Sequence, residues 1–353
     1  MKALPYALGY LLPPMVVLCA RAGGPWMFLP VLVTFAGVPV VDALSGRAAP
    51  APGGAPAASL EQGLAFRVIT WAWIPVQGLL VAWAMGLAAS GALDGPAFAG
   101  LALGVGACTG TVGITYAHEL VHRSSRIERA LGEALLTMVS YPHFAIEHVY
   151  GHHRHVATPA DPATARAGES FYRFLPRTMG GSLASAWRIE RRRVRTRHGS
   201  AWHPANRMAR YALTQALMYG ASAWVFGRAG VALLAAQALV AVAQLEVINY
   251  VEHYGLERRE LAPGRYEPVA ACHSWDSRYR VTNWLLINLA RHADHHLVAS
   301  RRYAALDLRD QAPELPAGYG AMFALALVPP LWRRVMDPRV AAWREVHLAG
   351  PPR

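Results

Sequence analysis

The sequence predicts an all-α membrane protein with about six transmembrane helices and a histidine-rich site at their cytoplasmic ends. Of its 353 residues, 54% are hydrophobic and only 16% are charged, and the mean hydropathy is +0.20. This composition is too apolar for a pair of soluble domains. The 11 Trp, 25 Pro and 31 Gly residues exclude a disordered chain and a coiled coil. Long runs without charged residues predict the transmembrane helices, and the large number of histidines predicts the site.

Six runs without charged residues have lengths close to the ~20 residues that a helix needs to cross a bilayer. They are residues 3–20, 22–41, 68–93, 95–117, 211–227 and 229–245. Only Arg228 separates the last two runs, which predicts a tight helical hairpin. The run 134–146 is too short to span and is expected at the interface or in the core. Residues 315–332 are long enough, but three prolines in this run favour a segment that lies along the membrane.

The basic residues predict the orientation of these helices. The short turns after the first, third and fifth runs contain only Arg21 and Arg228, so 32 of the 34 Lys and Arg residues lie elsewhere. Basic residues are retained in the cytoplasm. We therefore expect a multi-pass protein of the inner membrane, with both termini and the histidine-rich site in the cytoplasm.

The same pattern divides the chain into four regions. The predicted regions are the first four transmembrane helices in residues 1–117, a cytoplasmic region in 118–210, a transmembrane hairpin in 211–250 and a cytoplasmic C-terminal region in 251–353. Residues 47–58 are rich in Pro, Ala and Gly and are expected to form a cytoplasmic linker.

The cysteines exclude several kinds of site. Cys19, Cys108 and Cys272 lie far apart, and no Cys-x-x-Cys pair is present. The sequence therefore encodes neither a disulfide framework, nor a structural zinc site, nor a fused iron–sulfur module. Any bound metal must be held by histidine.

Nine of the fifteen histidines fall in four clusters. The clusters are His118 and His122; His148, His152 and His153; His253; and His292, His295 and His296. Separations of three or four residues place side chains on one face of a helix, which predicts a single stripe for the three histidines of the last cluster. The first cluster, HELVH, also matches the HExxH motif of zinc proteases, so it does not decide the chemistry by itself.

Histidines also cap helices or lie at the membrane interface without binding anything. Nine such rings buried beside the bilayer without a metal would leave costly unpaired polar groups. Nine ligands exceed the coordination of one ion and so imply two metals. Imidazole ligands suit Fe, Cu, Zn or Ni, but zinc cannot change its oxidation state, and hydrolysis does not require nine histidines.

Four histidine-containing elements and two later ones resemble a known family. They are HELVHR at 118–123, EHVYGHHRHVATPADPATA at 147–165, NYVEHYGL at 249–256, LARHADHHLVASRRY at 289–303, LPAGY at 315–319 and PPLWR at 329–333. Together they resemble the integral-membrane alkane 1-monooxygenases (alkane ω-hydroxylases) of the fatty-acid-desaturase-like superfamily, over about residues 60–340. The family often has Ala-Asn-Pro-Thr where this chain has Leu-Val-Ala-Ser at 297–300. This difference leaves the histidines intact and bears on substrate preference.

The resemblance implies a function and a cofactor. The nine clustered histidines would hold a non-haem diiron centre, and no catalytic residue is assigned apart from this centre. The reaction implied is terminal hydroxylation of medium- to long-chain n-alkanes to primary alcohols, with O2 and two electrons. The expected partners are a separate rubredoxin-type electron donor with its reductase, a hydrophobic small-molecule substrate and membrane lipid, and no nucleic acid.

Five carboxylates are expected to orient the ligands, since metal-bound imidazoles usually donate their second N–H to an acceptor. Glu119, Glu147, Glu252 and Asp294 are each adjacent to a proposed ligand, and Glu246 lies seven residues before His253. The alternative for Glu246 is an interfacial side chain that reaches water. Asp161-Pro162 is expected to cap and start a helix. The remaining histidines are expected to be structural; they are His143, His155, His198, His203, His273 and His347.

Two further patterns have competing interpretations. Glycines at 104, 106, 110 and 113 keep the fourth run thin, which would open a groove for substrate or allow close helix packing. The basic residues in 188–197 would dock an acidic electron carrier such as rubredoxin, or would reflect topology and contact with anionic lipid.

Other functions remain in competition. Within enzymes, the alternatives are hydroxylation of another methyl group, such as that of xylene, and desaturation or hydroxylation of fatty acyl chains. A metal transporter or sensor would require ionisable residues near the middle of the spans, which are nearly absent. A membrane zinc protease would have no use for three of the four clusters. The sequence leaves open the chain length, tolerance of aromatic substrates, the identity of the donor, the oligomeric state and the partition of histidines between the metals.

Overall fold

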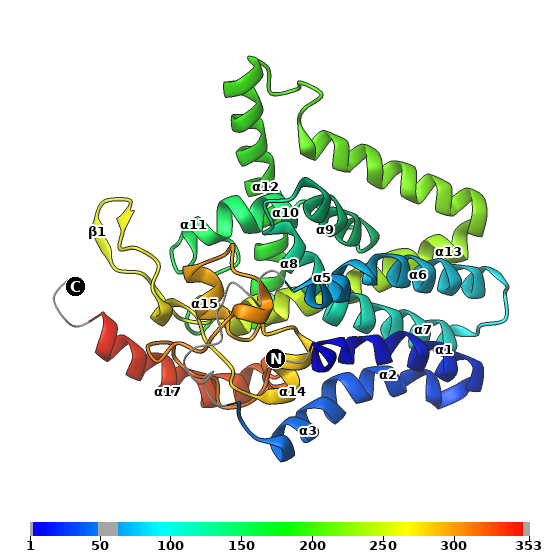
Figure 1. Cartoon of the computed structure of the whole chain (residues 1–353), viewed down its shortest axis with the longest axis horizontal. Coiled ribbons are helices and arrows are strands. Elements are labelled where there is room, and N and C mark those ends of the chain that lie inside the picture. The colour runs from blue at the N-terminus through cyan, green and yellow to red at the C-terminus, as the bar shows by residue number, and fades with distance from the viewer. Residues whose placement is uncertain (1–2, 49–62, 349–353) are drawn as a thin grey trace.

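The computed structural model describes residues 3–48 and 63–348, and it confirms a mostly helical membrane protein (Figure 1). Two strands form a small antiparallel hairpin, β1 (Glu260–Ala262) and β2 (Arg265–Tyr266). Most of the predicted linker at 47–58 lies outside the described residues.

Five helical stretches in the described part of the chain are long and apolar enough to cross a membrane. They are Leu4–Ala22 with α1 (Leu12–Ala22), Gly24–Ser45 with α2 (Leu29–Leu32) and α3 (Val38–Ser45), Leu64–Ala89 with α5 (Leu64–Trp71) and α6 (Trp73–Ala89), Gly95–Val121 with α7 (Gly95–Cys108) and α8 (Thr115–Val121), and α13 (Arg207–His253). The first four correspond to the first four predicted spans.

The last two predicted spans both lie in α13, which breaks within its length. Gly227 has φ 62° and ψ −165°, a conformation that favours glycine, and the helix changes direction there (Figure 1). The break is next to Arg228, where the sequence predicts the turn of a hairpin. The element α13 therefore consists of two helical arms that meet at Gly227, in agreement with the two predicted arms.

Polar side chains define where these helices begin. Asp94 caps α7 by accepting a hydrogen bond from the backbone N–H of Ala97 at 2.7 Å. Asn206 caps α13 by accepting from the N–H groups of Met208 and Ala209. Such caps satisfy N–H groups that have no partner within the helix, so each helix starts at a defined residue.

Glycines in the α7 region allow the second half of α13 to pack closely. A Cβ atom on Gly106 would lie 2.5 Å from Cβ of Val240, and one on Gly110 would lie 2.9 Å from the side chain of Gln244. Gln244 in turn donates a hydrogen bond to the carbonyl of Gly106 at 2.9 Å. Close packing of small residues therefore explains these glycines, as expected for helices in lipid.

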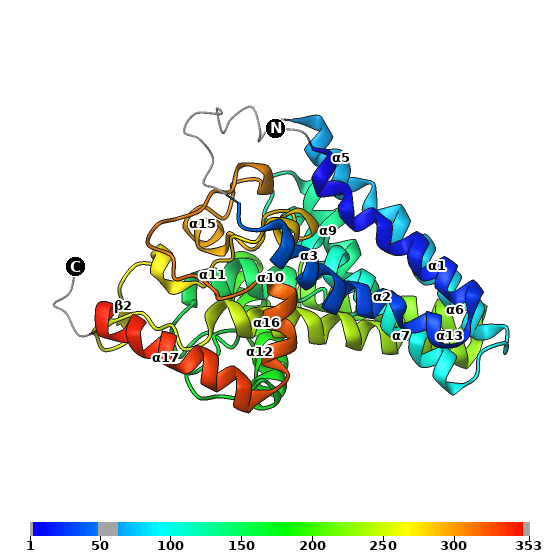
Figure 2. The same ribbon diagram turned by 90° about the horizontal axis from the view of Figure 1, so that it is seen from below.

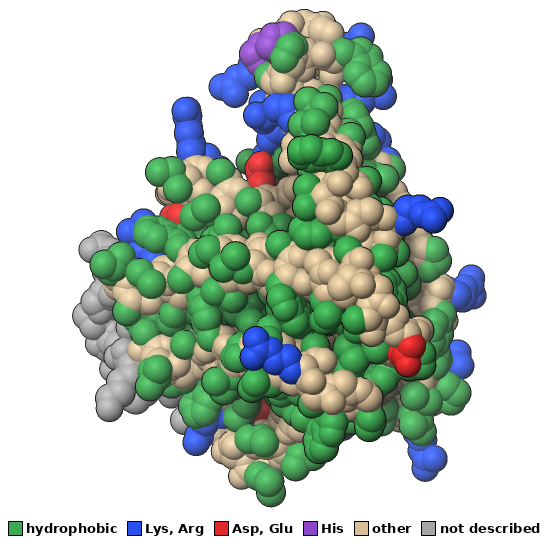
Figure 3. Space-filling view, turned by 90° about the vertical axis from the view of Figure 1, so that its right-hand side faces the viewer, with side chains coloured by type: hydrophobic (Ala, Val, Ile, Leu, Met, Phe, Trp, Pro, Cys, Tyr) green, Lys and Arg blue, Asp and Glu red, His purple; other side chains and the backbone are tan. Residues whose placement is uncertain are grey.

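The remaining helices gather at one end of the apolar helices (Figure 2). They are α9 (Arg126–Met138), α10 (Phe144–Glu147), α11 (His153–His155), α12 (Phe171–His198), α14 (Arg280–Leu285), α15 (His292–Leu297), α16 (Tyr319–Ala326) and α17 (Pro329–His347). The opposite end is dominated by hydrophobic side chains with few charges (Figure 3). This separation of apolar and polar regions fits an integral membrane protein.

Three local predictions are refined by the structure. The run 134–146 is buried, and it is divided between α9 and α10 by a turn at Ser140, where φ is 55°. Residues 315–332 form α16 and the start of α17 and are not among the stretches able to span. The prediction that Asp161 starts a helix is wrong, because the following residues form turns and α12 begins only at Phe171.

Candidate metal centre

The nine clustered histidines, far apart in the sequence, meet in two groups. One group contains His118, His122, His148, His153 and His295, and the other contains His152, His253, His292 and His296. Within each group, one ring nitrogen from every histidine lies within 4.8 Å of the others. The groups are neighbours, since the ring centroids of His153 and His296 are 4.5 Å apart. The clustered histidines lie at the C-terminal ends of α8 and α13, in the segment 148–153 and in α15.

The partition of the histidines differs from what regular helical spacing suggests. The segment His148–His152 is a π-helix, so His148 shares a group with His153, five residues later, and not with His152. A π-helical turn is wider than an α-helical turn and brings residues five apart to the same face. In α15, His292 and His296 share one group while His295 faces the other. The predicted single stripe therefore serves two sites.

The distances between ring nitrogens fit ligands of a shared ion. Pairs of Nε2 atoms are separated by 2.8 to 3.2 Å; the pairs are His118–His148, His148–His153, His153–His295, His253–His292 and His292–His296. Two nitrogens at a right angle around an ion, each bonded at ~2.1 Å, lie about 3.0 Å apart. Five donors in one group also exceed the four of a tetrahedral zinc site. The residues therefore fit two ions, one of them with five or more ligands.

Burial keeps the rings in the neutral form that binds metal. Burial, together with the neighbouring imidazoles, holds the pKa of His148 and of His295 well below the usual value of a histidine. The pKa values of His153, His292 and His296 are lowered for the same reasons. Neutral imidazole keeps a lone pair available for a metal.

Two buried nitrogens need a partner beyond the protein. Nε2 of His122 and Nε2 of His152 accept and donate no hydrogen bond among the described residues. Buried polar atoms are rarely left without a partner, because desolvation is costly. An ion in each group would satisfy one of these atoms.

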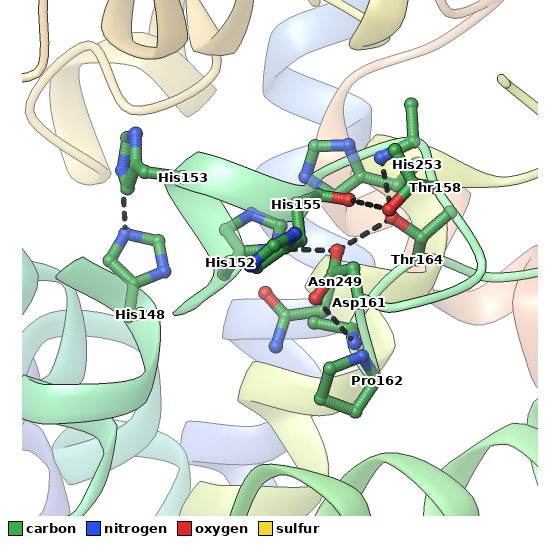
Figure 4. A network of polar contacts seen from close by, with 12 residues as sticks. His148, His152, His153, His155, Thr158, Asp161, Pro162, Thr164, Asn249 and His253 are labelled. Carbon is green, nitrogen blue, oxygen red and sulfur yellow. Dashed lines mark hydrogen bonds and ion pairs between the residues drawn. The ribbon is translucent and has the colours of Figure 1, made fainter. Parts of the chain in front are cut away.

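Asp161 orients one of the histidines, a role that the sequence reasoning missed. Nδ1 of His152 donates to Oδ2 of Asp161 at 2.8 Å (Figure 4). The same carboxylate accepts from Oγ1 of Thr164 at 2.6 Å and from the N–H of Ala163 at 3.0 Å. These bonds hold the ring of His152 with Nε2 toward its group. The signal in the sequence is an aspartate inside the histidine-rich stretch 147–165, where the Asp-Pro pair predicts a helix start.

Glu252 is the predicted carboxylate that reaches a clustered histidine directly. Its Oε2 lies 3.3 Å from Nε2 of His292, and its Oε1 accepts a hydrogen bond from the hydroxyl of Tyr319 at 2.9 Å. The contact is with the nitrogen that faces the other ligands, so Glu252 points toward the position of the ion.

The other four predicted carboxylates form no ion pair with a clustered histidine in the described part of the chain. Glu246 is buried and accepts from Tyr141, Thr178 and Asn249, so the alternative of a side chain in water is wrong.

Glu119 faces the guanidinium of Arg123, with Oε1 3.6 Å from Nε, and Asp294 pairs with Arg301 and Arg309. Glu147 is buried, and its Oε1 has no hydrogen-bond partner among the described residues.

The six remaining histidines do not join either group in the described part of the chain. Nε2 of His273 lies 3.1 Å from Oε1 of Glu267, and the rings of His198 and His203 stack with centroids 4.1 Å apart. These contacts are structural.

An apolar cavity adjoins both histidine groups. His118 and His148 of the first group, His292 of the second and Glu252 lie in its wall. The rest of the wall is mostly apolar and comes from several helices; it includes Phe35, Ile114, Phe144, Leu245, Ile248, Leu285, Leu289 and Phe323. Gly110 also lines the cavity, so one glycine of the thin stripe serves both packing and the open space.

Comparisons with known proteins agree with this site. A family model for fatty acid desaturases matches residues 94–326, which include all nine clustered histidines. Alkane 1-monooxygenase 1 of Pseudomonas aeruginosa is 42% identical over 328 residues, or 90% of this chain and 84% of that protein. Alkane 1-monooxygenase 2 of the same organism is 41% identical over 320 residues, or 90% and 85%. The xylene/toluene monooxygenase hydroxylase component of Pseudomonas putida is 28% identical over 246 residues, or 69% and 65%.

Proposed function

This chain belongs to the alkane 1-monooxygenases within the fatty acid desaturase family, and we propose that its two histidine groups hold the two iron ions with which it hydroxylates the terminal methyl group of n-alkanes. It is an integral membrane enzyme with a hydrophobic substrate. The reaction uses O2 and two electrons, and it yields a primary alcohol and water.

The observation that carries the proposal is the apolar cavity whose wall contains histidines from both groups. An alkane has no polar group, so only apolar packing can hold it. The mostly apolar wall of this cavity matches that requirement. His118, His148 and His292 lie in that wall, so a methyl group at the end of the cavity lies beside the metal ligands. We therefore propose that medium- to long-chain n-alkanes occupy this cavity.

Iron is favoured over zinc by the donor set. One group offers five imidazoles, and the cis-like spacing of Nε2 atoms suits a coordination number above four. Imidazole ligands are compatible with iron, whereas insertion of oxygen into a C–H bond requires a metal that changes its oxidation state. When bound, the diiron centre supplies the activation of O2.

The protein's own residues bind the alkane, orient the metal ligands and exclude water. The apolar wall holds the alkane and keeps water away from the reaction. Asp161 fixes the ring of His152, and Arg123 compensates the charge of Glu119 beside His118. Glu252 is the carboxylate in the cavity wall, and Tyr319 donates a hydrogen bond to it. Glu252 is therefore placed to hold or pass a proton between the metal ligands and the cavity.

Electrons must come from a separate protein, for which we propose a rubredoxin-type donor with its reductase. The chain carries a net charge of +12 and has no cysteine pairs for a fused iron–sulfur module. On α12, four exposed arginines would attract an acidic protein; they are Arg188, Arg191, Arg192 and Arg195. The proposed topology is that of an inner-membrane protein with both termini and the metal centre in the cytoplasm, on the same side as this donor.

A second candidate is hydroxylation of an aromatic methyl group, which the similarity to the xylene/toluene monooxygenase component favours. The test is product analysis from cells that contain the protein, a rubredoxin and its reductase, supplied with octane, hexadecane and p-xylene under 18O2. We expect 18O-labelled primary alcohols from the alkanes. Labelled product from xylene alone would favour the second candidate, and a desaturated or acyl-chain product would favour the wider desaturase family.

A further inference from the structure

A wide basin lies apart from the metal centre, between α9, the end of α12 and the start of α13. Six arginines line it. We name these residues the arginine basin: Arg126, Arg129, Arg193, Arg197, Arg207 and Arg210. No proposed ligand of the metal centre lies in its wall.

The arginine basin has a large excess of positive charge. Glu133 is the carboxylate in its wall, and Glu190 behind the wall pairs with Arg193 and Arg207. Six guanidinium groups against these two carboxylates leave an excess of four positive charges. In the described part of the chain, ion pairs with a carboxylate are formed by two of the six, Arg193 and Arg207. The other four, Arg126, Arg129, Arg197 and Arg210, have no carboxylate partner there.

The basin opens at the level where a membrane surface is expected. Arg207 and Arg210 lie in the first turn of α13, directly before its first apolar stretch, in which Leu213 and Leu217 are 61% and 64% exposed. On the opposite wall, Ile127 next to Arg126 is 72% exposed. The end of α9 lies beside this first half of α13 (Figure 1), where Nε2 of Gln215 donates a hydrogen bond to the carbonyl of Thr137 at 3.0 Å. The charged basin is therefore continuous with side chains that face lipid.

We propose that the arginine basin binds the headgroup of an anionic phospholipid, with the acyl chains along the first half of α13. Guanidinium groups form paired hydrogen bonds with phosphate oxygens, and basic pockets between membrane helices on the cytoplasmic side bind anionic headgroups. A soluble acidic protein would match the charge, but it would not cover the exposed leucines that adjoin the basin. The combination of phosphate-binding groups and adjoining apolar surface fits a lipid.

The lipid would contact the segment that carries metal ligands. Tyr150 lies in the basin wall and is 49% exposed, and the guanidinium of Arg207 lies 5.3 Å from its ring centroid. Tyr150 belongs to the π-helical segment between His148 and His152. A bound headgroup would therefore join α9, α12, α13 and this segment, and we expect it to raise the thermal stability of the protein.

The test compares lipid retention by native mass spectrometry. Protein with its bound metal is purified from nanodiscs that contain equal amounts of phosphatidylglycerol and phosphatidylcholine. We expect wild type to retain phosphatidylglycerol preferentially and the double variant Arg126→Gln/Arg210→Gln to bind it at least about tenfold more weakly. The matched control is Arg334→Gln/Arg339→Gln, which removes two exposed arginines from α17 and should leave the preference unchanged.

A second measurement keeps the proposal testable if the double variant folds poorly. Phosphatidylglycerol should raise the melting temperature of wild type more than phosphatidylcholine does, and inorganic phosphate should not reproduce the rise. Equal retention of both lipids by wild type, or unchanged retention by a folded double variant, would overturn the proposal. A double variant that keeps its lipid preference but requires more rubredoxin for half-maximal rate would assign the basin to the electron donor instead.

Discussion

Nδ1 of His152 donates a hydrogen bond to Oδ2 of Asp161 at 2.8 Å, and both side chains are buried. The bond fixes the tautomer of the ring and leaves Nε2 directed toward His253, His292 and His296. Burial alone would raise the pKa of Asp161, but its interaction with His152 and the hydrogen bonds from His152 and Thr164 lower it. One residue outside the histidine clusters thus sets the orientation of a proposed ligand.

Replacing Asp161 with Asn should weaken metal binding in the four-histidine group by about 10- to 100-fold, because the amide no longer holds the Nδ1–H tautomer with a charged acceptor. Competition of the protein with a chelator measures this affinity. Asp310→Asn, at an exposed position, is the control and should bind metal as wild type does. Unchanged affinity in Asp161→Asn would remove its orienting role.

Glu252→Gln should lower kcat by about 100-fold or more while KM for the alkane changes little, because the side chain keeps its size but can no longer hold a proton or a charge beside His292. Tyr319→Phe should give a smaller decrease, since it removes only the hydrogen bond to Glu252. Steady-state rates with saturating donor measure both variants. A wild-type kcat in Glu252→Gln would contradict its place in the reaction.

Leu245→Phe should shift the enzyme toward shorter alkanes. Leu245 lines the cavity seven residues before Glu252, about 10 Å along the helix, so a larger ring there shortens the space beyond the metal centre. A misplaced methylene costs ~1–3 kcal/mol, so the ratio of rates on octane and hexadecane should rise about 10- to 200-fold. Leu239→Phe, at an exposed position of the same helix, should leave the ratio unchanged.

Glu190→Gln should lower the melting temperature at pH 7 by several degrees. Burial alone would raise the pKa of Glu190, but hydrogen bonds from Arg193 and Arg207 lower it to about 2. A lowered pKa stabilises the folded state above the ordinary value of about 4.5, and this contribution is lost as the pH falls toward 2. The difference in melting temperature between wild type and Glu190→Gln should therefore shrink between pH 5 and pH 3. A difference independent of pH would exclude this ionic origin.

The sequence predicted those features that depend on local composition. The apolar runs and the positions of the nine histidines are visible in the chain itself, and the structure brings all nine together. The partition of His148 and His152 between two groups was not predictable, because it depends on a π-helical turn that regular spacing does not reveal. The contact of Asp161 with His152 was missed because it arises from the turn that follows α11 and not from the spacing of two residues on one helix.

The central claim is that each histidine group holds one iron ion. Metal analysis of the purified protein loaded with iron tests it most directly, with His122→Ala and His253→Ala as one variant of each group and His347→Ala as the control. We expect two iron ions per chain in wild type and in His347→Ala, and about one in each of the other variants. One ion per chain in wild type, or two in both His122→Ala and His253→Ala, would contradict the account.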